Sequence, residues 1–251
     1  MPVEIFFEDY TVGHETTERA DMNAKIERMR WIGDTYNVII GSERGNDFSS
    51  EVITFSHGMT SYVMDWMDDD LRKNEDSEYY LGKYGAVTGV PSKYVKEVPL
   101  KPKHKKIYYD MKYSLPLFEL VYNDSVFSSY HWEMGSLKVP EENVNNMLKE
   151  VLYSIPPLYH LDREYWNKYR EVISNHVKVW SELHEITAPL EMTNFEILDE
   201  NRLVQRTEFS GKVSVTANFK DTEYNYNGKI IPAKSASINN GEKEFIYTPK
   251  Y

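Results

Sequence analysis

The sequence contains no cysteine among its 251 residues. This absence excludes disulfide bonds, thiolate nucleophiles, and zinc or iron–sulfur sites built on thiolate ligands, while it leaves the redox environment open. Long apolar runs are missing too, since no stretch approaches the roughly 20 residues that a membrane-spanning helix needs. Residues 1–7 lack the basic and apolar regions of a secretory signal. We therefore expect a cytoplasmic protein without a membrane partner.

Basic residues are fewer than acidic ones. Lys and Arg number 29 against 40 Asp and Glu, so the formal net charge is −11. Such a charge repels a phosphate backbone, which argues against nucleic acid as a partner but leaves neutral ligands such as sugars unaffected. The chain also has neither a glycine-rich phosphate loop nor a helical histidine pair beside an acid, so we expect no cofactor and no metal.

Helical and strand-like segments alternate over residues 1–190, which is typical of a parallel α/β architecture. Helical periodicity predicts helices at 17–36, 141–153 and 162–183. Short apolar runs predict strands at 37–41, 52–58, 116–122 and 157–160. The polar stretch 68–106 is predicted to be a long excursion, a feature that usually signals function or disorder.

The pattern changes near residue 191 to short alternating segments separated by turn signals such as Asn227-Gly228. The predicted strands are 195–198, 203–209, 213–219 and 229–231. We therefore predict two domains, a parallel α/β domain at 1–190 and a separate antiparallel β domain at 191–251.

Glu43 is the sharpest catalytic candidate. It directly follows the predicted strand 37–41, and in a (β/α) barrel the catalytic groups lie at the C-terminal ends of the strands. A carboxylic acid beside a buried apolar strand is partly desolvated, which raises its pKa toward the value that a general acid needs. The alternative is a structural carboxylate held by Arg44 or by a neighbouring helix.

Two further predicted strands also end in polar residues. His57 closes one of them and Asp124 follows the other, and both suit contacts with a sugar. Each has a structural alternative, an imidazole hydrogen-bonded within the fold and an aspartate that caps the next element. Shortly afterwards Tyr130, His131 and Trp132 form an aromatic cluster that is either a sugar platform or part of the core.

Glycoside hydrolysis uses two carboxylates roughly 5 to 10 Å apart, so Glu43 needs a partner. The upstream candidate is Asp9, which precedes Glu43 by 34 positions (43 minus 9). This span suits one barrel helix with its flanking loops. The alternative is that segment 8–10 is only a loop.

A series of blocks, in this order and spacing, carries a family resemblance over nearly the whole chain. The blocks are Glu8–Thr11, Gly13–Thr17, Arg28–Ile32, Ile40–Glu43, Gly45–Phe48, Phe55–Gly58, Pro116–Asp124, Pro156–Tyr159, Glu191–Thr193, Val204–Thr207 and Val215–Phe219. They resemble bacterial glycoside hydrolases related to the endo-α-N-acetylgalactosaminidases. The resemblance is specific for fold and enzyme class and not for substrate.

The resemblance implies that 1–190 is the C-terminal part of a (β/α)8 barrel and that 191–251 is a small antiparallel β-sandwich. It also implies a retaining mechanism on α-linked glycosides, with an Asp nucleophile on one strand and a Glu acid/base on the next. Glu43 matches the acid/base. The family's nucleophile would lie upstream of Met1, so a missing or separately encoded N-terminal half would complete the barrel and cover its open edges.

Two functions of different kinds follow. The chain is either part of a working glycosidase, with Glu43 and Asp9 as catalytic residues and with His57, Asp124 and the His131-Trp132 pair at the sugar site, or an inactive carbohydrate-binding or structural remnant. An unrelated α/β enzyme acting on a small molecule would need a complete catalytic pair within 1–190, and the sequence offers no convincing one.

Overall fold

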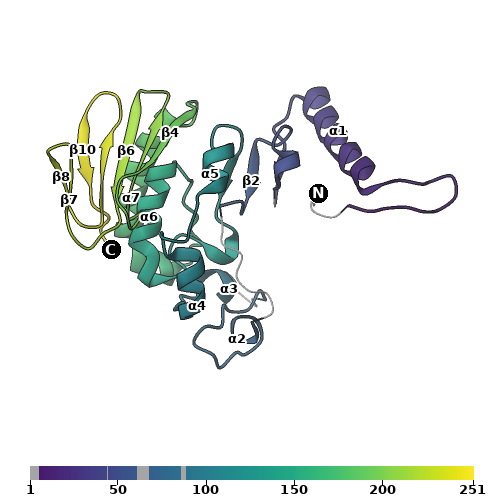
Figure 1. Ribbon diagram of the computed structural model, residues 1–251. Coiled ribbons are helices and arrows are strands. Elements are labelled where there is room, and N and C mark those ends of the chain that lie inside the picture. Colours follow the sequence, from purple (N-terminus) through teal and green to yellow (C-terminus); the bar gives the residue numbers. More distant parts are fainter. Residues whose placement is uncertain (1–5, 44, 61–67, 86–88) are drawn as a thin grey trace.

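The computed structural model describes residues 6–43, 45–60, 68–85 and 89–251. Within these ranges a three-stranded parallel sheet and a five-stranded antiparallel sheet are connected through helices (Figure 1). The parallel and antiparallel parts of the predicted fold are thus confirmed. None of the helices in the described ranges combines the length and the apolar character needed to cross a membrane.

Helix α1 (Glu18–Tyr36) confirms the first predicted helix. The Thr17 hydroxyl accepts a hydrogen bond from the backbone N–H of Ala20 and caps its start, and Asn37 ends it in the left-handed conformation with φ 50°. Because Asn37 ends the helix, the strand predicted at 37–41 is wrong over most of its length. Only Gly41–Ser42, named β1, pairs as a strand.

Three short parallel strands form the first sheet, in the order β1-β2-β3. Strand β2 is Phe55–His57, within the predicted 52–58, and β3 is Phe127–Ser129. The register places Ser42 opposite Ser56, and Ser56 opposite Ser128. Because parallel strands end at the same edge of a sheet, the residues after β1, β2 and β3 meet at one edge.

Two strand predictions are wrong. Residues Leu117–Tyr122 form helix α5, because a short apolar run fits a buried turn of helix as well as a strand. Residues 157–160 have no strand pairing, although the backbone of Leu158 bonds to Ser136 through both its N–H and its carbonyl. Strand β3 was not predicted, since it is short and consists mostly of serine.

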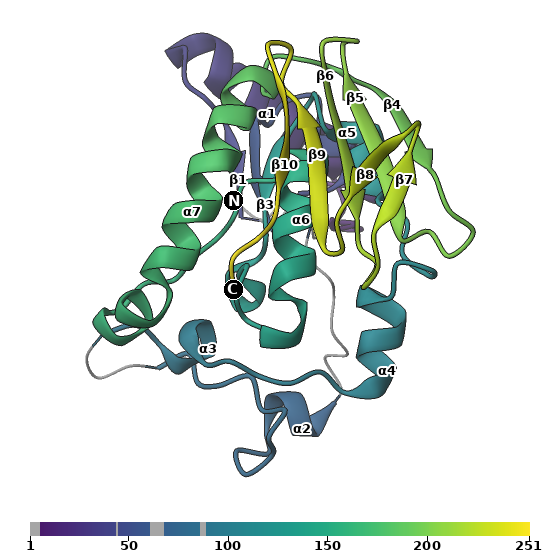
Figure 2. The same cartoon turned by 90° about the vertical axis from the view of Figure 1, so that its left-hand side faces the viewer.

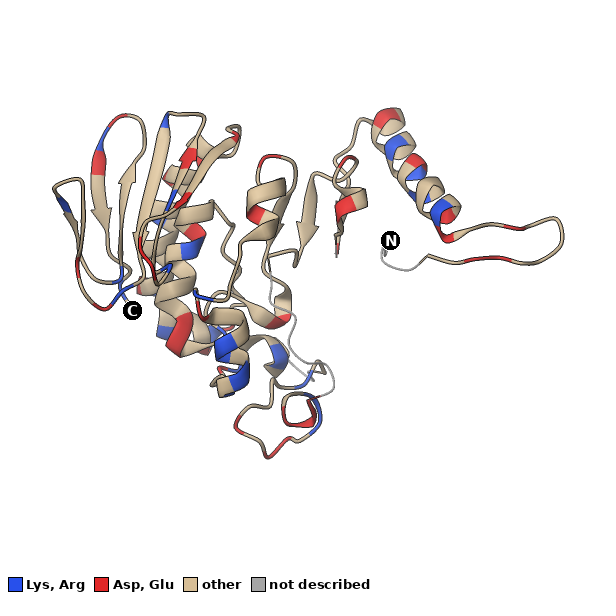
Figure 3. Ribbon diagram, in the orientation of Figure 1, with Lys and Arg blue, Asp and Glu red and all other residues tan. Residues whose placement is uncertain are grey.

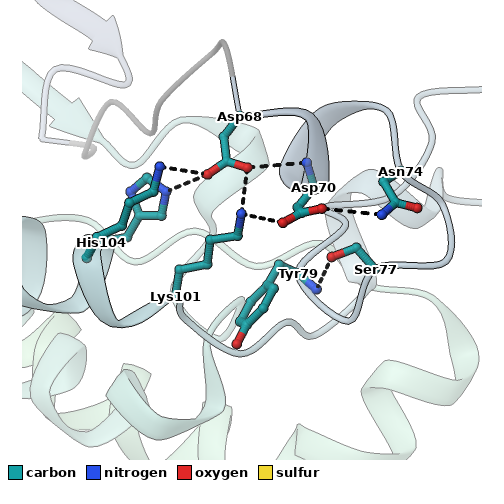
Figure 4. A network of polar contacts seen from close by, with 8 residues as sticks. Asp68, Asp70, Asn74, Ser77, Tyr79, Lys101 and His104 are labelled. Carbon is teal, nitrogen blue, oxygen red and sulfur yellow. Dashed lines mark hydrogen bonds and ion pairs between the residues drawn. The ribbon is translucent and has the colours of Figure 1, made fainter.

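The polar excursion 68–106 is folded around its own small apolar cluster, which includes Leu71, Leu81 and Val98. Its helices are α2 (Asp69–Arg72), α3 (Ser92–Val95), α4 (Pro102–His104) and the π-helix η2 (Lys105–Tyr109). A buried carboxylate, Asp68, holds the excursion together (Figure 4). It accepts from Lys101 at 2.6 Å and contacts Lys103 at 2.9 Å, and these ammonium groups hold its pKa well below its usual range.

Helices α6 (Asn143–Tyr153) and α7 (Arg163–Thr187) confirm the two helices predicted in the second half of the chain. Short 3-10 turns, η1 (Asp47–Ser49) and η4 (Pro140–Glu142), precede β2 and α6. Helix α6 packs on the antiparallel sheet and contacts α7, which Figure 2 shows running beside α6. One apolar cluster joins Leu148, Val151 and Leu152 of α6 to the inner residues of that sheet.

The antiparallel sheet has the strand order β10-β9-β6-β5-β4. Its strands are β4 (Met192–Ile197), β5 (Val204–Phe209), β6 (Val213–Asn218), β9 (Ser235–Asn239) and β10 (Glu244–Tyr247). A separate hairpin, β7 (Tyr224–Tyr226) with β8 (Lys229–Ile231), turns at Asn227 and Gly228, whose φ values of 52° and 87° match the turn predicted there. Strands β7, β9 and β10 were not predicted.

Candidate functional site

Three of the predicted site residues lie together at the C-terminal edge of the parallel sheet. His57 is the last residue of β2, and its ring centroid is 5.6 Å from that of His131 and 5.1 Å from that of Trp132. The rings of His131 and Trp132 are 4.8 Å apart. We call His57, His131 and Trp132 the aromatic cluster. Parallel pairing of β2 with β3 brings them together.

The backbone around the aromatic cluster fixes its geometry. Trp132 begins a 3-10 turn, η3 (Trp132–Met134), and the imidazole of His131 accepts from the N–H of Glu133 at 3.4 Å. Gly58 follows His57 with φ +93°, and a Cβ there would lie 3.1 Å from the Cβ of His131. Only glycine combines that backbone conformation with so close an approach.

Tyr94 and His160 extend the aromatic cluster and were missed by the sequence reasoning. Their rings stack with centroids 4.7 Å apart, and Tyr94 lies 6.5 Å from Trp132. The Nε2–H of His160 donates to the carbonyl of Trp132 at 2.9 Å. His160 ends a predicted strand and so met the criterion that selected His57. Tyr94 belongs to α3 of the excursion, whose length was itself a signal of function.

The electrostatics of the aromatic cluster favour neutral imidazoles. Burial lowers the pKa of His57, the neighbouring His160 lowers it further, and the charge of Glu43 acts in the opposite direction. Burial also lowers the pKa of His160, against the effect of its hydrogen bond to Trp132. A neutral imidazole both donates and accepts hydrogen bonds, as a sugar hydroxyl does.

Two buried polar atoms of the aromatic cluster are unpaired within the described part of the chain. The Nδ1 of His57 and the indole Nε1 of Trp132 find no hydrogen-bond partner among the residues that the structure describes. Buried polar atoms are normally paired, so each orphan calls for a partner. Together with the aromatic faces, they form a surface suited to a sugar ring.

Glu43 lies beside this cluster. Continuing the β1–β2 register by one residue beyond Ser42 and Ser56 places Glu43 opposite His57, in agreement with its effect on the pKa of His57. Its own side chain is exposed, so the desolvation predicted for it is not supplied by this chain. Arg44, the alternative structural partner, lies outside the described residues.

Asp9 is not brought to this site. It lies in a hairpin before α1, where its backbone pairs with Thr16 in both directions at 3.1 and 2.9 Å. Its carboxylate accepts from the N–H of Thr11 at 2.8 Å, and hydrogen bonds from Thr11 lower its pKa. Figure 1 shows the segment before α1 running away from the parallel sheet. In this position Asp9 closes a turn.

Asp124 lies at the other end of the sheet. Because 116–122 is helix α5 and not a strand, Asp124 precedes β3, and it is exposed in the turn between them. Its carboxylate accepts from the Ser125 hydroxyl at 3.3 Å. The premise that it follows a strand was wrong, and the structure separates it from the aromatic cluster.

The described residues do not form a metal-binding cluster. No group of three or more His, Asp or Glu side chains among them could hold a metal ion. Figure 3 shows basic and acidic residues mixed along α1 and around α2 to α4. The site is therefore built from aromatic rings, imidazoles and one carboxylate.

Comparisons with known proteins identify a family for this chain. A family model described as glycosyl hydrolases related to GH101 family, GH129, matches residues 3–208. The α-N-acetylgalactosaminidase NagBb from Bifidobacterium bifidum is similar in its ligand-free form, with 16% identity, a TM-score of 0.47, and coverage of 90% of this chain and 28% of that one. The GalNAc complex of the same enzyme has 15% identity and a TM-score of 0.46, and the match covers 91% of this chain and 29% of that one. No curated protein matches the sequence.

The chain spans less than a third of the length of these solved structures. The family match, in contrast, runs from the segment before α1 through the parallel sheet to β5 and so covers most of the chain. This chain belongs to glycoside hydrolase family GH129.

Proposed function

We propose that this chain is the C-terminal portion of a retaining glycosidase that acts on α-linked glycosides, with Glu43 as its acid/base. The observation that carries the proposal is the aromatic cluster at the edge of the parallel sheet, with two orphan polar atoms beside Glu43. The solved relatives are named α-N-acetylgalactosaminidases, so an α-linked N-acetylgalactosaminide is the first substrate to test.

We propose a matching role for the fold. The three parallel strands would be the C-terminal part of a (β/α)8 barrel spanning 1–190, and 191–251 would be an appended β-sandwich made of the five-stranded sheet and the β7–β8 hairpin. The position of β1 as the outermost strand of the described parallel sheet supports this proposal, because in a barrel the sheet would continue beyond it. The partner would be the N-terminal half of the same barrel, in one longer chain or in another.

In the proposed mechanism Glu43 protonates the leaving oxygen while a second carboxylate attacks the anomeric carbon. Glu43 then removes a proton from the water that releases the sugar. The two carboxyl groups of a retaining enzyme lie about 5 to 5.5 Å apart, and the described position of Asp9 does not support it as that partner. The nucleophile would come from the N-terminal half, which would also cover the exposed side chain of Glu43.

The second candidate function is a carbohydrate-binding remnant without turnover. The distance of the Asp9 hairpin from the parallel sheet favours it for the isolated chain. In that case the aromatic cluster would bind sugar and Glu43 would have no catalytic partner. His57, His131 and Trp132 keep the same role in both proposals.

The test is hydrolysis of aryl α-N-acetylgalactosaminides by the chain supplied with its N-terminal half, beside Glu43→Gln. We expect Glu43→Gln to lose at least ~100-fold with a poor leaving group and much less with a good one, since only the former needs a proton. Glu182→Gln, an exposed glutamate on α7, is the matched control. Equal losses for both leaving groups would refute the acid role, and sugar binding without any turnover would support the remnant.

A further inference from the structure

A second hollow lies on the other face of the parallel sheet. Residues alternate along β3, so Ser128 and the following Tyr130 face one side while Ser129 and His131 face the other. Tyr130 packs with the apolar cluster of α6, whereas His131 joins the aromatic cluster. Tyr130 also lines a cavity of about 190 Å³ between α5, the end of β3 and α6. This cavity is therefore separate from the site beside Glu43.

The cavity is lined by a buried carboxyl group. Glu119 of α5 is 8% exposed and lines the cavity, and its carboxylate accepts a hydrogen bond from its own backbone N–H. Burial raises the pKa of Glu119 to about 7, against the effects of that hydrogen bond and of the Lys149 ammonium. A carboxyl group buried with so little compensation is costly, and a ligand that hydrogen-bonds to it would offset that cost.

An unpaired hydroxyl group lines the same cavity. The hydroxyl oxygen of Thr60 is buried and has no hydrogen-bond partner in the described ranges. The remaining wall is formed partly by the aromatic residues Phe118, Tyr130 and Tyr153. Polar groups that converge between aromatic faces are the usual composition of a small-molecule site.

Charge and size define the ligand. Glu119 disfavours an anion and Lys149 disfavours a cation, so a neutral molecule fits best. The aromatic walls suit an apolar ring face, and the carboxyl and hydroxyl groups suit ring hydroxyls. At about 30 Å³ per water, the cavity equals roughly six waters, which is room for one small ring and not for an oligosaccharide.

We propose that this cavity is a second carbohydrate site, which takes a single neutral sugar residue and holds its hydroxyls with Glu119 and Thr60. The site requires no hydrolysis and no residue of the aromatic cluster. A sugar bound there would lie between α5, β3 and α6, and would hydrogen-bond to both the Glu119 carboxyl group and the Thr60 hydroxyl. The proposal thus stands apart from the catalytic role of Glu43.

The test is calorimetric titration of the chain with N-acetylgalactosamine and with galactose, and with cyclohexanol, acetate and ethylammonium as probes of ring, anion and cation binding. We expect Thr60→Val to weaken sugar binding at one site about tenfold, the effect of one lost hydrogen bond in a buried site. Glu119→Leu should weaken it further, and Glu119→Gln, which keeps the hydrogen-bonding capacity, should weaken it least. Trp132→Ala should leave this site unchanged.

The outcomes separate the two proposals. Binding that Trp132→Ala removes, and that Thr60→Val leaves intact, would overturn the second site while supporting the aromatic cluster. Binding that only Thr60→Val and Glu119→Leu reduce would support the second site even if the proposed function fails. Absence of sugar binding by the folded chain, or tighter binding of ethylammonium or acetate than of sugar, would also overturn it.

Discussion

A buried polar network that joins three elements allows a quantitative prediction about stability. Glu150 of α6 and His176 of α7 are 0% and 1% exposed, and their Oε2 and Nε2 atoms lie 2.7 Å apart. The two atoms are in close contact without the alignment of a hydrogen bond. The Nδ1 of His176 bonds to the hydroxyl of Tyr247 in β10 at 2.6 Å. The network therefore ties both helices to the antiparallel sheet.

Removing one member of the Glu150–His176 pair should lower the free energy of unfolding far more than removing both members together. His176→Leu keeps most of the volume but leaves the Glu150 carboxyl buried alone, which costs about 3–5 kcal/mol. Tyr247→Phe leaves only one imidazole nitrogen unpaired, which should lower the free energy of unfolding by about 1–3 kcal/mol. Replacing both members of the pair, with Glu150→Met and His176→Leu, should recover most of the loss in unfolding free energy, since neither side chain of an apolar pair needs a polar partner.

Urea unfolding followed by circular dichroism measures these free energies, and thermal melting gives a second scale. For a chain of this size a loss of about 1 kcal/mol in unfolding free energy lowers the melting temperature by roughly 2–4 °C. His176→Leu should therefore melt about 6–20 °C lower than the natural sequence. The double variant should melt well above the single one. A double variant as unstable as the sum of its two single variants would refute the argument that the Glu150–His176 pair carries the effect.

Three further predictions concern single positions. Gly58→Ala should destabilise the fold by about 1–3 kcal/mol and weaken sugar binding, whereas Gly89→Ala, also at positive φ but with no atom within 4 Å of its Cβ, should lose less in the same melt. In the folded chain the pKa of Glu119 is raised to about 7 from 4.5. Its contribution to the free energy of unfolding is therefore complete below pH 4.5 and falls by about 3 kcal/mol as the pH rises to 7. The free energy of unfolding of Glu119→Gln should lack this decline, and an identical decline in both proteins would exclude Glu119 as its source. Asp68→Asn removes the negative charge that two lysines share and should accelerate tryptic cleavage within 68–106 while cleavage of the antiparallel sheet stays unchanged.

The aromatic cluster shows how far a simple positional rule reaches. The rule that functional groups follow the ends of parallel strands selected His57, whereas His131 and Trp132 were selected as neighbouring aromatic residues, and the structure brings all three together. The same rule selected Asp124 through a strand that does not exist. The seven-residue run 116–122 has too few turns to show its period, so the error arose in the secondary structure and then spread to the site.

Long-range contacts could not be predicted in the same way. The stacking of Tyr94 on His160 depends on how the excursion folds around its own apolar cluster, and no local pattern encodes that arrangement. The Glu119 cavity has the same origin. The run that contains Glu119 was predicted as a strand, and only the tertiary packing around α5 buries its carboxyl group.

The sequence by itself determined the elements whose signals are local and repeated: α1, α6 and α7 through helical periodicity, the β7–β8 turn through Asn-Gly, and the family through ordered blocks of residues. Only the tertiary structure decided which side chains share a site. It placed Glu43 beside His57 and left Asp9 in a distant hairpin, because strand register and packing set distances between residues far apart in the chain.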